Sequence, residues 1–427
     1  MKENIVVSCL SNGIRVITQE RETEAVAFCF FVGCGSRNEK DEIVGVSHAL
    51  EHSMFKGTSL RTAHDIARET EGKGAEINAF TSEECTCYWF AAPADTFREV
   101  AEVYADSLHN SLLDEKEWST EQKNILEERL MYEESNTLCV QSILLPEAMF
   151  NLQMSVIGSI KTIKRIKPIH MRELIKEWYL PENIIISVAG GIKHKVILEI
   201  CEELFGNFHK SWDVNPKLPT LNPLPAQSPE PYVEKIRKEK QFGIAMGFRA
   251  YSKTDERSHA ASLLNLILGG GMSSRLFQEV REKRGFAYSV YSSREGFKDT
   301  GTFSITAFTS NPLEALPVII KELGKIRKSP VSDREIRDAK IARKAFSKKE
   351  EGSVSFALRN ASSIFYHGRI IGRDEGYKKI EGVSKKDILA VARDIFVPDN
   401  ITIALTGPRS WYPEIQEEIH FNFKKRL

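Results

Sequence analysis

Two histidines four residues apart, His48 and His52, have the spacing of a metal site. On an α-helix, residues at this spacing lie one turn apart on one face, so both imidazoles can bind one cation. Glu51 lies beside them and completes a His-x-x-Glu-His pattern, the reverse of the His-Glu-x-x-His order of many zinc peptidases. A catalytic zinc lowers the pKa of its water toward 7, and a carboxylate then accepts the proton. The pattern therefore predicts metal-assisted hydrolysis with Glu51 as the general base.

A catalytic zinc needs a third protein ligand, and its best source is a helix predicted over residues 119–134. This segment opens with a capping-box pattern, Ser119-Thr120-Glu121-Gln122. Glu121 and Glu128 are seven residues apart, so they project from the same side of the helix, two turns apart. One carboxylate could bind the metal while the other accepts a hydrogen bond from a ligating histidine and fixes its tautomer. The spacing leaves open which does which, and paired glutamates on a charged helix are more often merely exposed.

The composition excludes several other classes of function. The 59 Lys and Arg residues balance 59 Asp and Glu residues, so no basic surface for nucleic acid or an anionic membrane is expected. No apolar run approaches the length of a membrane span, and no signal peptide is visible. None of the seven cysteines forms a Cys-x-x-Cys pair. We therefore expect a cytoplasmic protein with reduced thiols.

An internal repeat relates the two halves of the chain. The stretch YLPENIIISVAG at 179–190 resembles FVPDNITIALTG at 396–407, with an offset of 217 residues (396 − 179). A weaker similarity links residues 74–82 with residues 285–293. Two large copies indicate paired homologous domains rather than a solenoid.

A proline-rich segment divides these halves. Six of the 16 prolines lie between Pro216 and Pro231, which favours an extended, semi-rigid linker because proline is excluded from helix interiors and central strands. We predict an N-terminal catalytic domain at 1–212, a linker at 213–231 and a C-terminal structural and substrate-binding domain at 232–427.

Mixed strands and helices in each half predict an α+β fold, in which an antiparallel-rich mixed sheet packs against helices. The strands expected in the first half are 13–18 and 25–32, paired as a hairpin, and 77–91. The expected helices are 44–54, 62–71, 96–110 and 119–134, and a further helix precedes each copy of the repeat, at 171–178 and 386–395.

Several motifs resemble the pitrilysin/insulinase family of zinc peptidases, most closely its mitochondrial-processing-peptidase-like bacterial subfamily. The resemblance covers nearly the whole chain in the right order. The motifs that carry it are SHALEHSMFKGT at 47–58, GAEINAFT at 74–81, ECTCY at 84–88, EQKNILEE at 121–128, LGGGMSSRLF at 268–277 and REKRGFAY at 281–288.

The resemblance implies roles for the residues of the metal site. The implied zinc ligands are His48, His52 and Glu128. Glu51 is then the general base, and Glu121 is a supporting carboxylate. Glu127 competes for the third ligand position, but the family pattern places that ligand on the second of two adjacent glutamates.

The resemblance also implies substrate contacts. Asn78 and Ala79, on an edge strand, would hold the substrate backbone as an added strand. Arg281 and Tyr288, from the second half, would reach the substrate carbonyls. On residue type alone, Arg281 could instead be a surface charge and Tyr288 a core residue of a strand. The second half has no His-x-x-Glu-His in the helix expected at 260–268, so we expect it to bind no metal.

The function implied is that of a zinc metalloendopeptidase that hydrolyses peptides or unfolded segments in a chamber between two domain pairs. A homodimer, or a heterodimer with a related subunit, would form that chamber. One alternative is a non-catalytic assembly subunit, although such subunits typically lose the metal motif that is complete here. Another is a dedicated leader-peptide processing protease, which shares the chemistry and differs only in substrate.

Overall fold

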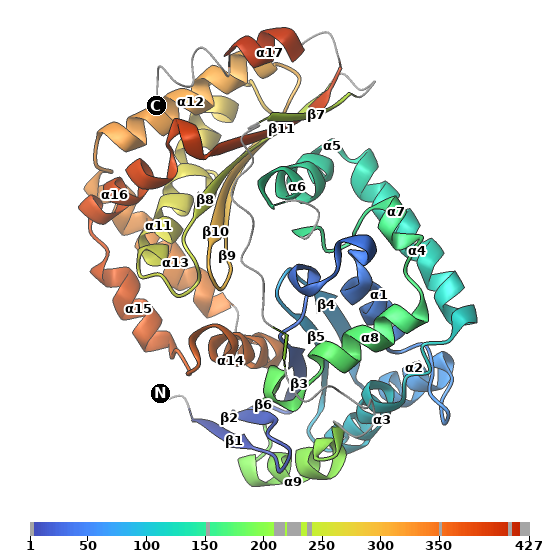
Figure 1. The fold of residues 1–427 in the computed structure, drawn as a ribbon. Coiled ribbons are helices and arrows are strands. Elements are labelled where there is room, and N and C mark those ends of the chain that lie inside the picture. Colours follow the sequence, from blue (N-terminus) through green and yellow to red (C-terminus); the bar gives the residue numbers. More distant parts are fainter. Residues whose placement is uncertain are drawn as a thin grey trace. The chain divides into compact units, whose positions relative to one another are not determined.

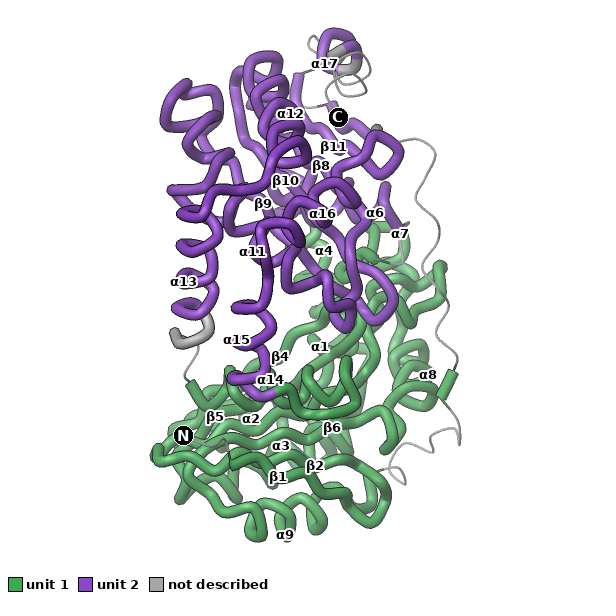
Figure 2. Tube along the Cα trace, turned by 90° about the vertical axis from the view of Figure 1, so that its left-hand side faces the viewer, with its two compact units in different colours: residues 1–129, 152–222, 350–371 green, residues 130–151, 223–349, 372–427 purple. Residues whose placement is uncertain are grey.

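The computed structural model describes residues 4–150, 154–208, 218–219, 232–236, 241–349, 352–408 and 412–418. The chain divides into two compact units (Figure 2). Unit 1 contains residues 1–129, 152–222 and 350–371, and unit 2 contains residues 130–151, 223–349 and 372–427. These units differ from the predicted domains, 1–212 and 232–427, because each takes one segment from the other half. The linker predicted at 213–231 lies, apart from residues 218–219, outside the described residues.

The two exchanged segments occupy equivalent places in the repeat. Helices α5, η3 and α6 cover residues 136–150 of unit 2, and α14 covers residues 353–367 of unit 1, an offset of 217 at both ends (353 − 136 and 367 − 150). Strands β6 and β11 show the same offset (401 − 184). The duplication therefore extends from the sequence to the elements, and each copy supplies a helical segment to the unit built mainly from the other copy.

Unit 1 is built on a six-stranded mixed sheet in the order β1-β2-β6-β3-β5-β4. Among the described strands of this sheet, only β2 and β6 pair in parallel. The strands are β1 (Ile5–Cys9), β2 (Arg15–Glu20), β3 (Ala25–Val32), β4 (Glu76–Thr81), β5 (Thr86–Pro93) and β6 (Ile184–Gly190).

Both faces of this sheet are covered, which explains why β3 reads as a continuous apolar run. Successive side chains of a strand point to opposite faces. On one face, Phe28 stacks against Phe90, with ring centroids 5.1 Å apart, and against Phe205 of α9 at 5.7 Å. On the other face, Phe31 belongs to a buried cluster that includes Phe356 of α14. Figure 1 shows these helices against the sheet.

The helices of unit 1 follow the same layers. They are η1 (Ser36–Asn38), η2 (Asp41–Ile43), α1 (Val46–Ser53), α2 (Ala63–Glu71), α3 (Phe97–Asn110), α4 (Glu115–Glu134), α7 (Ile160–Ile163), α8 (Pro168–Trp178), η5 (Pro181–Asn183), α9 (His194–Phe205) and α14 (Ser353–His367). The boundary between the units falls inside α4, after Arg129.

Unit 2 repeats the architecture with a five-stranded sheet in the order β7-β11-β8-β10-β9. Only β7 and β11 are parallel among its described strands. The strands are β7 (Tyr232–Ile236), β8 (Phe242–Ala250), β9 (Ser289–Gly296), β10 (Gly301–Thr309) and β11 (Ile401–Gly407). The two sheets confirm the predicted α+β class with antiparallel-rich mixed sheets.

Helices cover both faces of the second sheet. On one face, Phe396 packs edge-on against Phe248 and Phe303, with ring centroids 5.1 and 5.2 Å apart. On the other, the Arg249 guanidinium lies over the Phe150 ring of α6. The helices are α5 (Asn136–Leu138), η3 (Cys139–Leu144), α6 (Leu145–Phe150), α11 (Arg257–Gly269), η6 (Phe277–Glu282), α12 (Pro312–Lys328), α13 (Asp333–Lys349), α15 (Arg373–Gly382), α16 (Lys385–Ile395), η7 (Pro398–Asn400) and α17 (Tyr412–Glu418).

Three predicted local features are wrong. The strands expected at 13–18 and 25–32 do not form a hairpin, because β6 lies between β2 and β3. The strand expected at 77–91 is two strands, β4 and β5, which pair antiparallel. The helix expected from residue 119 begins at Glu115, where Asp114 accepts a hydrogen bond from the Lys116 N–H at 2.6 Å.

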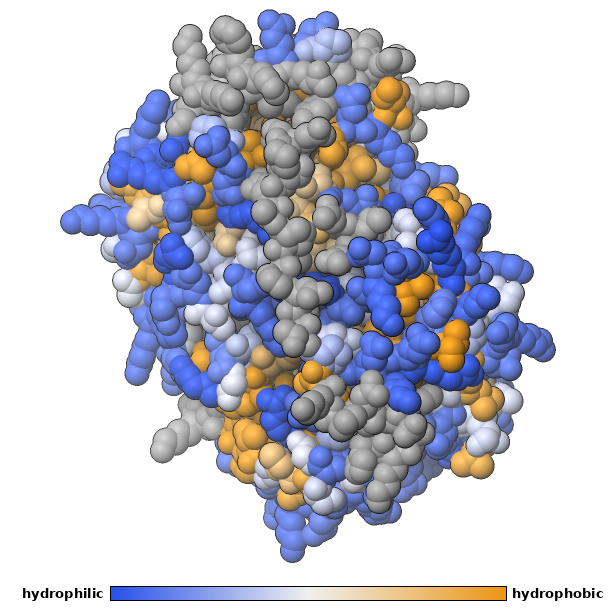
Figure 3. All heavy atoms as spheres, viewed as in Figure 1, coloured by the Kyte–Doolittle hydropathy of each residue, from blue (hydrophilic) through white to orange (hydrophobic). Residues whose placement is uncertain are grey.

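Hydrophilic residues dominate the face shown in Figure 3. Among the described residues, no helix is both long and apolar enough to cross a membrane.

Candidate active site

A glycine and a buried carboxyl group set the start of helix α1, which carries both histidines. Gly45 precedes the helix with φ +100°, a left-handed conformation that favours glycine. The Glu39 carboxyl group accepts hydrogen bonds from the N–H groups of Gly45 and Ser47, at 2.5 and 2.7 Å. Burial raises the pKa of Glu39 to about 7, against the opposing effect of these donors. Glu39 therefore satisfies N–H groups that an isolated helix leaves unpaired.

The side chains of α1 and α4 bring three potential ligands together. The Nε2 atoms of His48 and His52 each lie 3.7 Å from Oε2 of Glu128. All three ligand atoms fall within 4.8 Å of one another. His48, His52 and Glu128 are the residues that the sequence predicts as ligands, and the structure brings them together.

Helix α4 is held in place by contacts outside the cluster. The indole Nε1 of Trp118 donates to the Ile166 carbonyl at 3.0 Å, and the Gln122 amide donates to the Ile163 carbonyl at 2.9 Å. Two turns after Trp118, Ile125 is buried, and two turns after Gln122, Arg129 donates to the Gly158 carbonyl. These contacts fix the rotation of α4, so Glu121 and Glu128 face α1.

Glu121 supports His52 rather than completing the ligand set. Its Oε2 lies 3.2 Å from Nδ1 of His52, the ring nitrogen that does not face Glu128. Its Oε1 accepts from the Lys56 ammonium at 2.7 Å. A carboxylate on the far nitrogen of a ligating histidine fixes the tautomer that leaves Nε2 free to bind. Lys56 is a supporting residue that sequence reasoning missed, although it lies within the stretch 47–58.

The electrostatics of the cluster suit neutral histidine ligands. Burial, assisted by the neighbouring His52, lowers the pKa of His48 to about 3. Burial raises the pKa of Glu128, with His52 opposing. Burial also acts to raise the pKa of Glu121, but hydrogen bonds from Lys56 and His52 outweigh it and leave that pKa below its usual value. A metal-binding histidine must be deprotonated, so His48 is already in the required form.

Glu51 lies on the same helix but does not belong to the ligand cluster. Its Oε2 accepts a hydrogen bond from the Thr81 hydroxyl at 2.7 Å. Burial raises the pKa of Glu51, and the Thr81 hydroxyl opposes that shift. A partly desolvated carboxylate with a raised pKa accepts and returns a proton more readily near neutral pH. Sequence reasoning missed Thr81 because it lies at the end of β4, thirty residues further along the chain.

The donor set fits zinc. Two imidazole nitrogens and one carboxylate oxygen form a ligand set of catalytic zinc sites, which leave a fourth position open. Ligands about 2.1 Å from a tetrahedral zinc lie about 3.4 Å from one another. Oε2 of Glu128 lies at a similar distance, 3.7 Å, from each histidine Nε2. Nδ1 of His48 is buried without a described hydrogen-bond partner. Glu127 is exposed and is not part of the cluster.

The predicted substrate strand is an edge strand of unit 1. β4 pairs with β5 and stands last in the order of the described strands. Asn78 is exposed and Ala79 is half-buried. The Asn78 carbonyl accepts from the Tyr104 hydroxyl at 3.2 Å. An edge strand offers backbone groups to an extended peptide, so the position is compatible with the predicted role, which remains a prediction.

Arg281 and Tyr288 lie together in unit 2. The Arg281 guanidinium lies 5.5 Å from the centre of the Tyr288 ring and 4.9 Å from that of Phe277. Tyr288 directly precedes β9, and its side chain is 74% exposed. It is therefore not a core residue of a strand, which removes the structural alternative for this tyrosine. Its contact with substrate remains a prediction.

Comparisons with known proteins assign the family. Residues 15–158 match the model for insulinase (peptidase family M16), and residues 166–343 match the model for the peptidase M16 inactive domain. A relative from Bacillus subtilis, named an uncharacterized zinc protease, is 32% identical over 94% of this chain and 98% of its own length. A relative from Streptomyces coelicolor with the same kind of name is 33% identical, with 90% of this chain and 86% of that protein covered. The chain belongs to peptidase family M16.

Solved structures share the fold. A protease from Helicobacter pylori superimposes with a TM-score of 0.87 at 21% identity, covering 95% of this chain and 100% of that one. A peptidase M16 inactive domain from Pseudomonas fluorescens gives a TM-score of 0.85 at 19% identity, over 95% and 98% of the two chains. The predicted family is thus confirmed, while the mitochondrial-processing-peptidase-like subfamily remains a prediction.

Proposed function

We propose that this protein is a zinc metalloendopeptidase. The observation that carries the proposal is the convergence of His48, His52 and Glu128, with Glu51 one residue from His52 on the same helix. Relatives named zinc proteases, similar over nearly their whole lengths, support the same cofactor and activity. His48, His52 and Glu128 would hold the zinc.

The residues around the metal divide the chemical work. Zinc bound here would polarise a substrate carbonyl and make a water molecule more acidic. Glu51 would accept the proton of that water and return it to the leaving amine, with Thr81 orienting its carboxylate. Glu121 would hold His52 in its ligating tautomer, and Lys56 would keep Glu121 ionised.

Peptides or unfolded segments are the proposed substrates. Asn78 and Ala79 of the edge strand β4 would bind the substrate backbone as an added strand, which reads main chain more than side chains. Arg281 and Tyr288 would contact substrate carbonyls. A homodimer or a heterodimer with a related subunit, enclosing a chamber, and a cytoplasmic location belong to the same proposal.

The inactive-domain match does not favour the alternative of a non-catalytic subunit. That match begins at residue 166, after all three proposed ligands. It therefore agrees with a second half that binds no metal, while the first half carries the complete set. A dedicated leader-peptide processor would use the same site and differ only in substrate.

A peptide-library digest tests the proposal. The purified full-length chain is incubated with mixed peptides, with and without a chelator, and the products are read by mass spectrometry. We expect internal cleavage that disappears with chelator and returns when zinc is added. Cleavage at full rate by protein that is free of zinc would contradict the proposal.

A further inference from the structure

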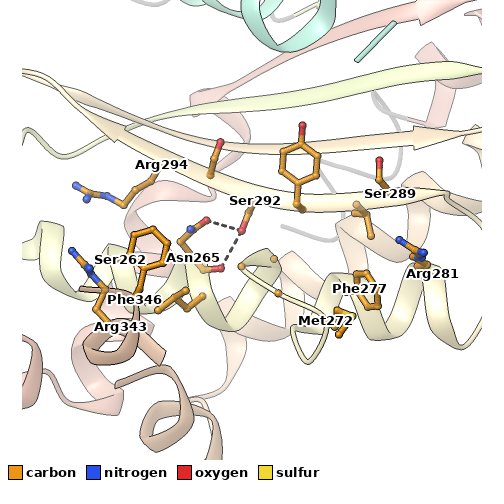
Figure 4. A pocket seen from close by; sticks show the side chains of 17 residues that line it. Ser262, Asn265, Met272, Phe277, Arg281, Ser289, Ser292, Arg294, Arg343 and Phe346 are labelled. Carbon is orange, nitrogen blue, oxygen red and sulfur yellow. Dashed lines mark hydrogen bonds between the residues drawn. The ribbon is translucent and has the colours of Figure 1, made fainter. Parts of the chain in front are cut away.

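A cavity of about 760 Å³ is lined only by residues of unit 2, whereas the residues of the metal cluster belong to unit 1. Its walls come from β9, α11, η6 and α13 (Figure 4). The described residues that line it include three arginines and no aspartate or glutamate. Such a cationic lining without acidic residues has no evident structural purpose.

Arg294 and Arg343 lie at one end of the cavity, and Arg281 lies at the other (Figure 4). Arg281 is held by the rings of Phe277 and Tyr288. Within the part of the chain that the structure describes, no aromatic ring holds Arg294 or Arg343 in this way. Arg294 comes from strand β9 and Arg343 from helix α13, so two separate elements bring like charges to one place.

Arg294 is half-buried, and two of its three guanidinium nitrogens are buried without a hydrogen-bond partner among the described residues. Its Nε and one Nη atom are inaccessible to solvent and make no hydrogen bond among the described residues. Burial lowers the pKa of Arg294, and the positive charge of Arg343 adds to that effect. Burial lowers the pKa of His259, and Arg294 and Arg343 also act to lower it, whereas Glu256 acts to raise it. The carboxylate of Glu256 is already paired with the Lys379 ammonium at 2.9 Å.

An unpaired buried charge destabilises a protein unless an opposite charge approaches it. Guanidinium groups offer parallel N–H donors that match the two oxygens of a carboxylate. The Asn265 side-chain oxygen accepts from Ser292 at 2.7 Å, which leaves its amide N–H groups as further neutral donors on this wall. The remaining lining includes exposed apolar side chains, among them Met272 and Phe346. An anionic group on a partly apolar chain fits this combination.

We propose that this cavity is a carboxylate-binding subsite for peptides, in which Arg294 and Arg343 pair with one carboxylate. An acidic side chain and a peptide C-terminus present the same chemistry, and either could occupy the subsite. The choice of peptides as ligands rests on the proposed peptidase function, whereas the preference for a carboxylate rests on the two arginines.

Binding of three matched peptides tests the proposal. The peptides share one neutral sequence and carry a central Glu with an amidated C-terminus, a central Gln with an amidated C-terminus, or a central Gln with a free C-terminus. Affinities are measured by calorimetry on the full-length chain carrying Glu51→Gln, so that cleavage does not interfere. We expect at least one carboxylate peptide to bind about tenfold more tightly than the amidated Gln peptide, a difference of about 1.4 kcal/mol. The peptide that gains affinity identifies the source of the carboxylate.

Arginine variants locate the preference. Arg294→Gln and Arg343→Gln should each reduce the carboxylate preference to about twofold or less. Arg334→Gln is the matched control, because Arg334 lies on the same helix with an 85% exposed side chain and does not line the cavity. It should retain the full preference. Melting temperatures identify any variant that fails to fold, and if Arg294→Gln does so, the half-buried Arg343 decides the test.

Equal binding of all three peptides to the parent chain would overturn the subsite. Retention of the preference in a folded Arg343→Gln variant would overturn it as well. The library digest separates the two proposals. Zinc-dependent cleavage without a carboxylate preference refutes only the subsite, whereas a carboxylate preference in a chain without zinc-dependent cleavage refutes only the peptidase.

Discussion

At the scale of single residues, Glu128 and Glu127 provide a sharp test of the metal site. Oε2 of Glu128 lies 3.7 Å from both histidine Nε2 atoms, whereas Glu127 is exposed and outside the cluster. Glu128→Gln removes a charged ligand and should cause a large loss of bound zinc, while the matched Glu127→Gln should bind zinc like the parent. Metal analysis of the purified variants measures this. Loss of zinc only in Glu127→Gln would show that the ligand assignment is off by one residue.

The sequence predicts the ligands because their geometry is local. His48 and His52 are one helical turn apart, and Glu121 and Glu128 two turns apart, so the α-helix alone places each pair on one face. Their spacing does not tell which of Glu121 and Glu128 is the ligand. Only the family resemblance assigns Glu128 as the ligand and Glu121 as the supporting carboxylate. Thr81 and Lys56 could not be assigned supporting roles, because their contacts depend on how β4 and α4 pack around α1.

At the scale of elements, the start of α1 is constrained at Gly45. A Cβ atom there would lie 2.7 Å from the Ile157 carbonyl oxygen, and the residue has φ +100°. Gly45→Ala therefore combines backbone strain, about 1–2 kcal/mol for a left-handed residue, with a clash against backbone. We expect a lower melting temperature and reduced zinc content, because the helix that carries His48 begins at Val46.

Gly13→Ala is the control for Gly45→Ala. Gly13 has nearly the same φ, +98°, but a Cβ atom there would meet nothing within 4 Å. It should lose only the strain term and retain its zinc. Equal stability and equal zinc content in the two variants would show that the contact with Ile157 does not position the zinc helix.

Helix positions were predicted better than strand pairing. Amphipathic spacing and local composition predict the first and last residues of α1, α2 and α3 to within about two residues. Strand β6, which separates β2 from β3, comes from residues 184–190, more than 150 residues further along the chain. No local pattern near 13–32 could indicate that insertion, so the hairpin prediction failed.

At the scale of the whole molecule, the exchange of helical segments ties the two halves together. Residues 353–367 cover a face of the first sheet, where Phe356, Ala357 and Ile364 join the buried cluster around Phe31. Burying one such large apolar side chain contributes about 1.5–3 kcal/mol, against a total stability of about 5–15 kcal/mol. The repeat predicts two related domains, but not that each would take a segment from the other half.

Separate fragments test this exchange. Fragments 1–222 and 223–427, each expressed alone, should be insoluble or lack a cooperative melting transition, because each lacks a segment of its own unit. Expressed together, they should form a soluble complex that binds zinc. Solubility, thermal melting and zinc content measure the outcome. A fragment 1–222 that melts cooperatively by itself would show that the 353–367 helix is dispensable for unit 1.

The central claim is that Glu51 acts as the base beside a zinc held by His48, His52 and Glu128, and Glu51→Gln tests it most directly. The amide preserves the size of the side chain but cannot accept the proton. Zinc content and peptide turnover are measured on the same preparations of parent and variant. We predict one zinc per chain in both proteins and a kcat lower by about 10²–10⁴-fold in the variant. Turnover near that of the parent, with zinc retained, would contradict the account.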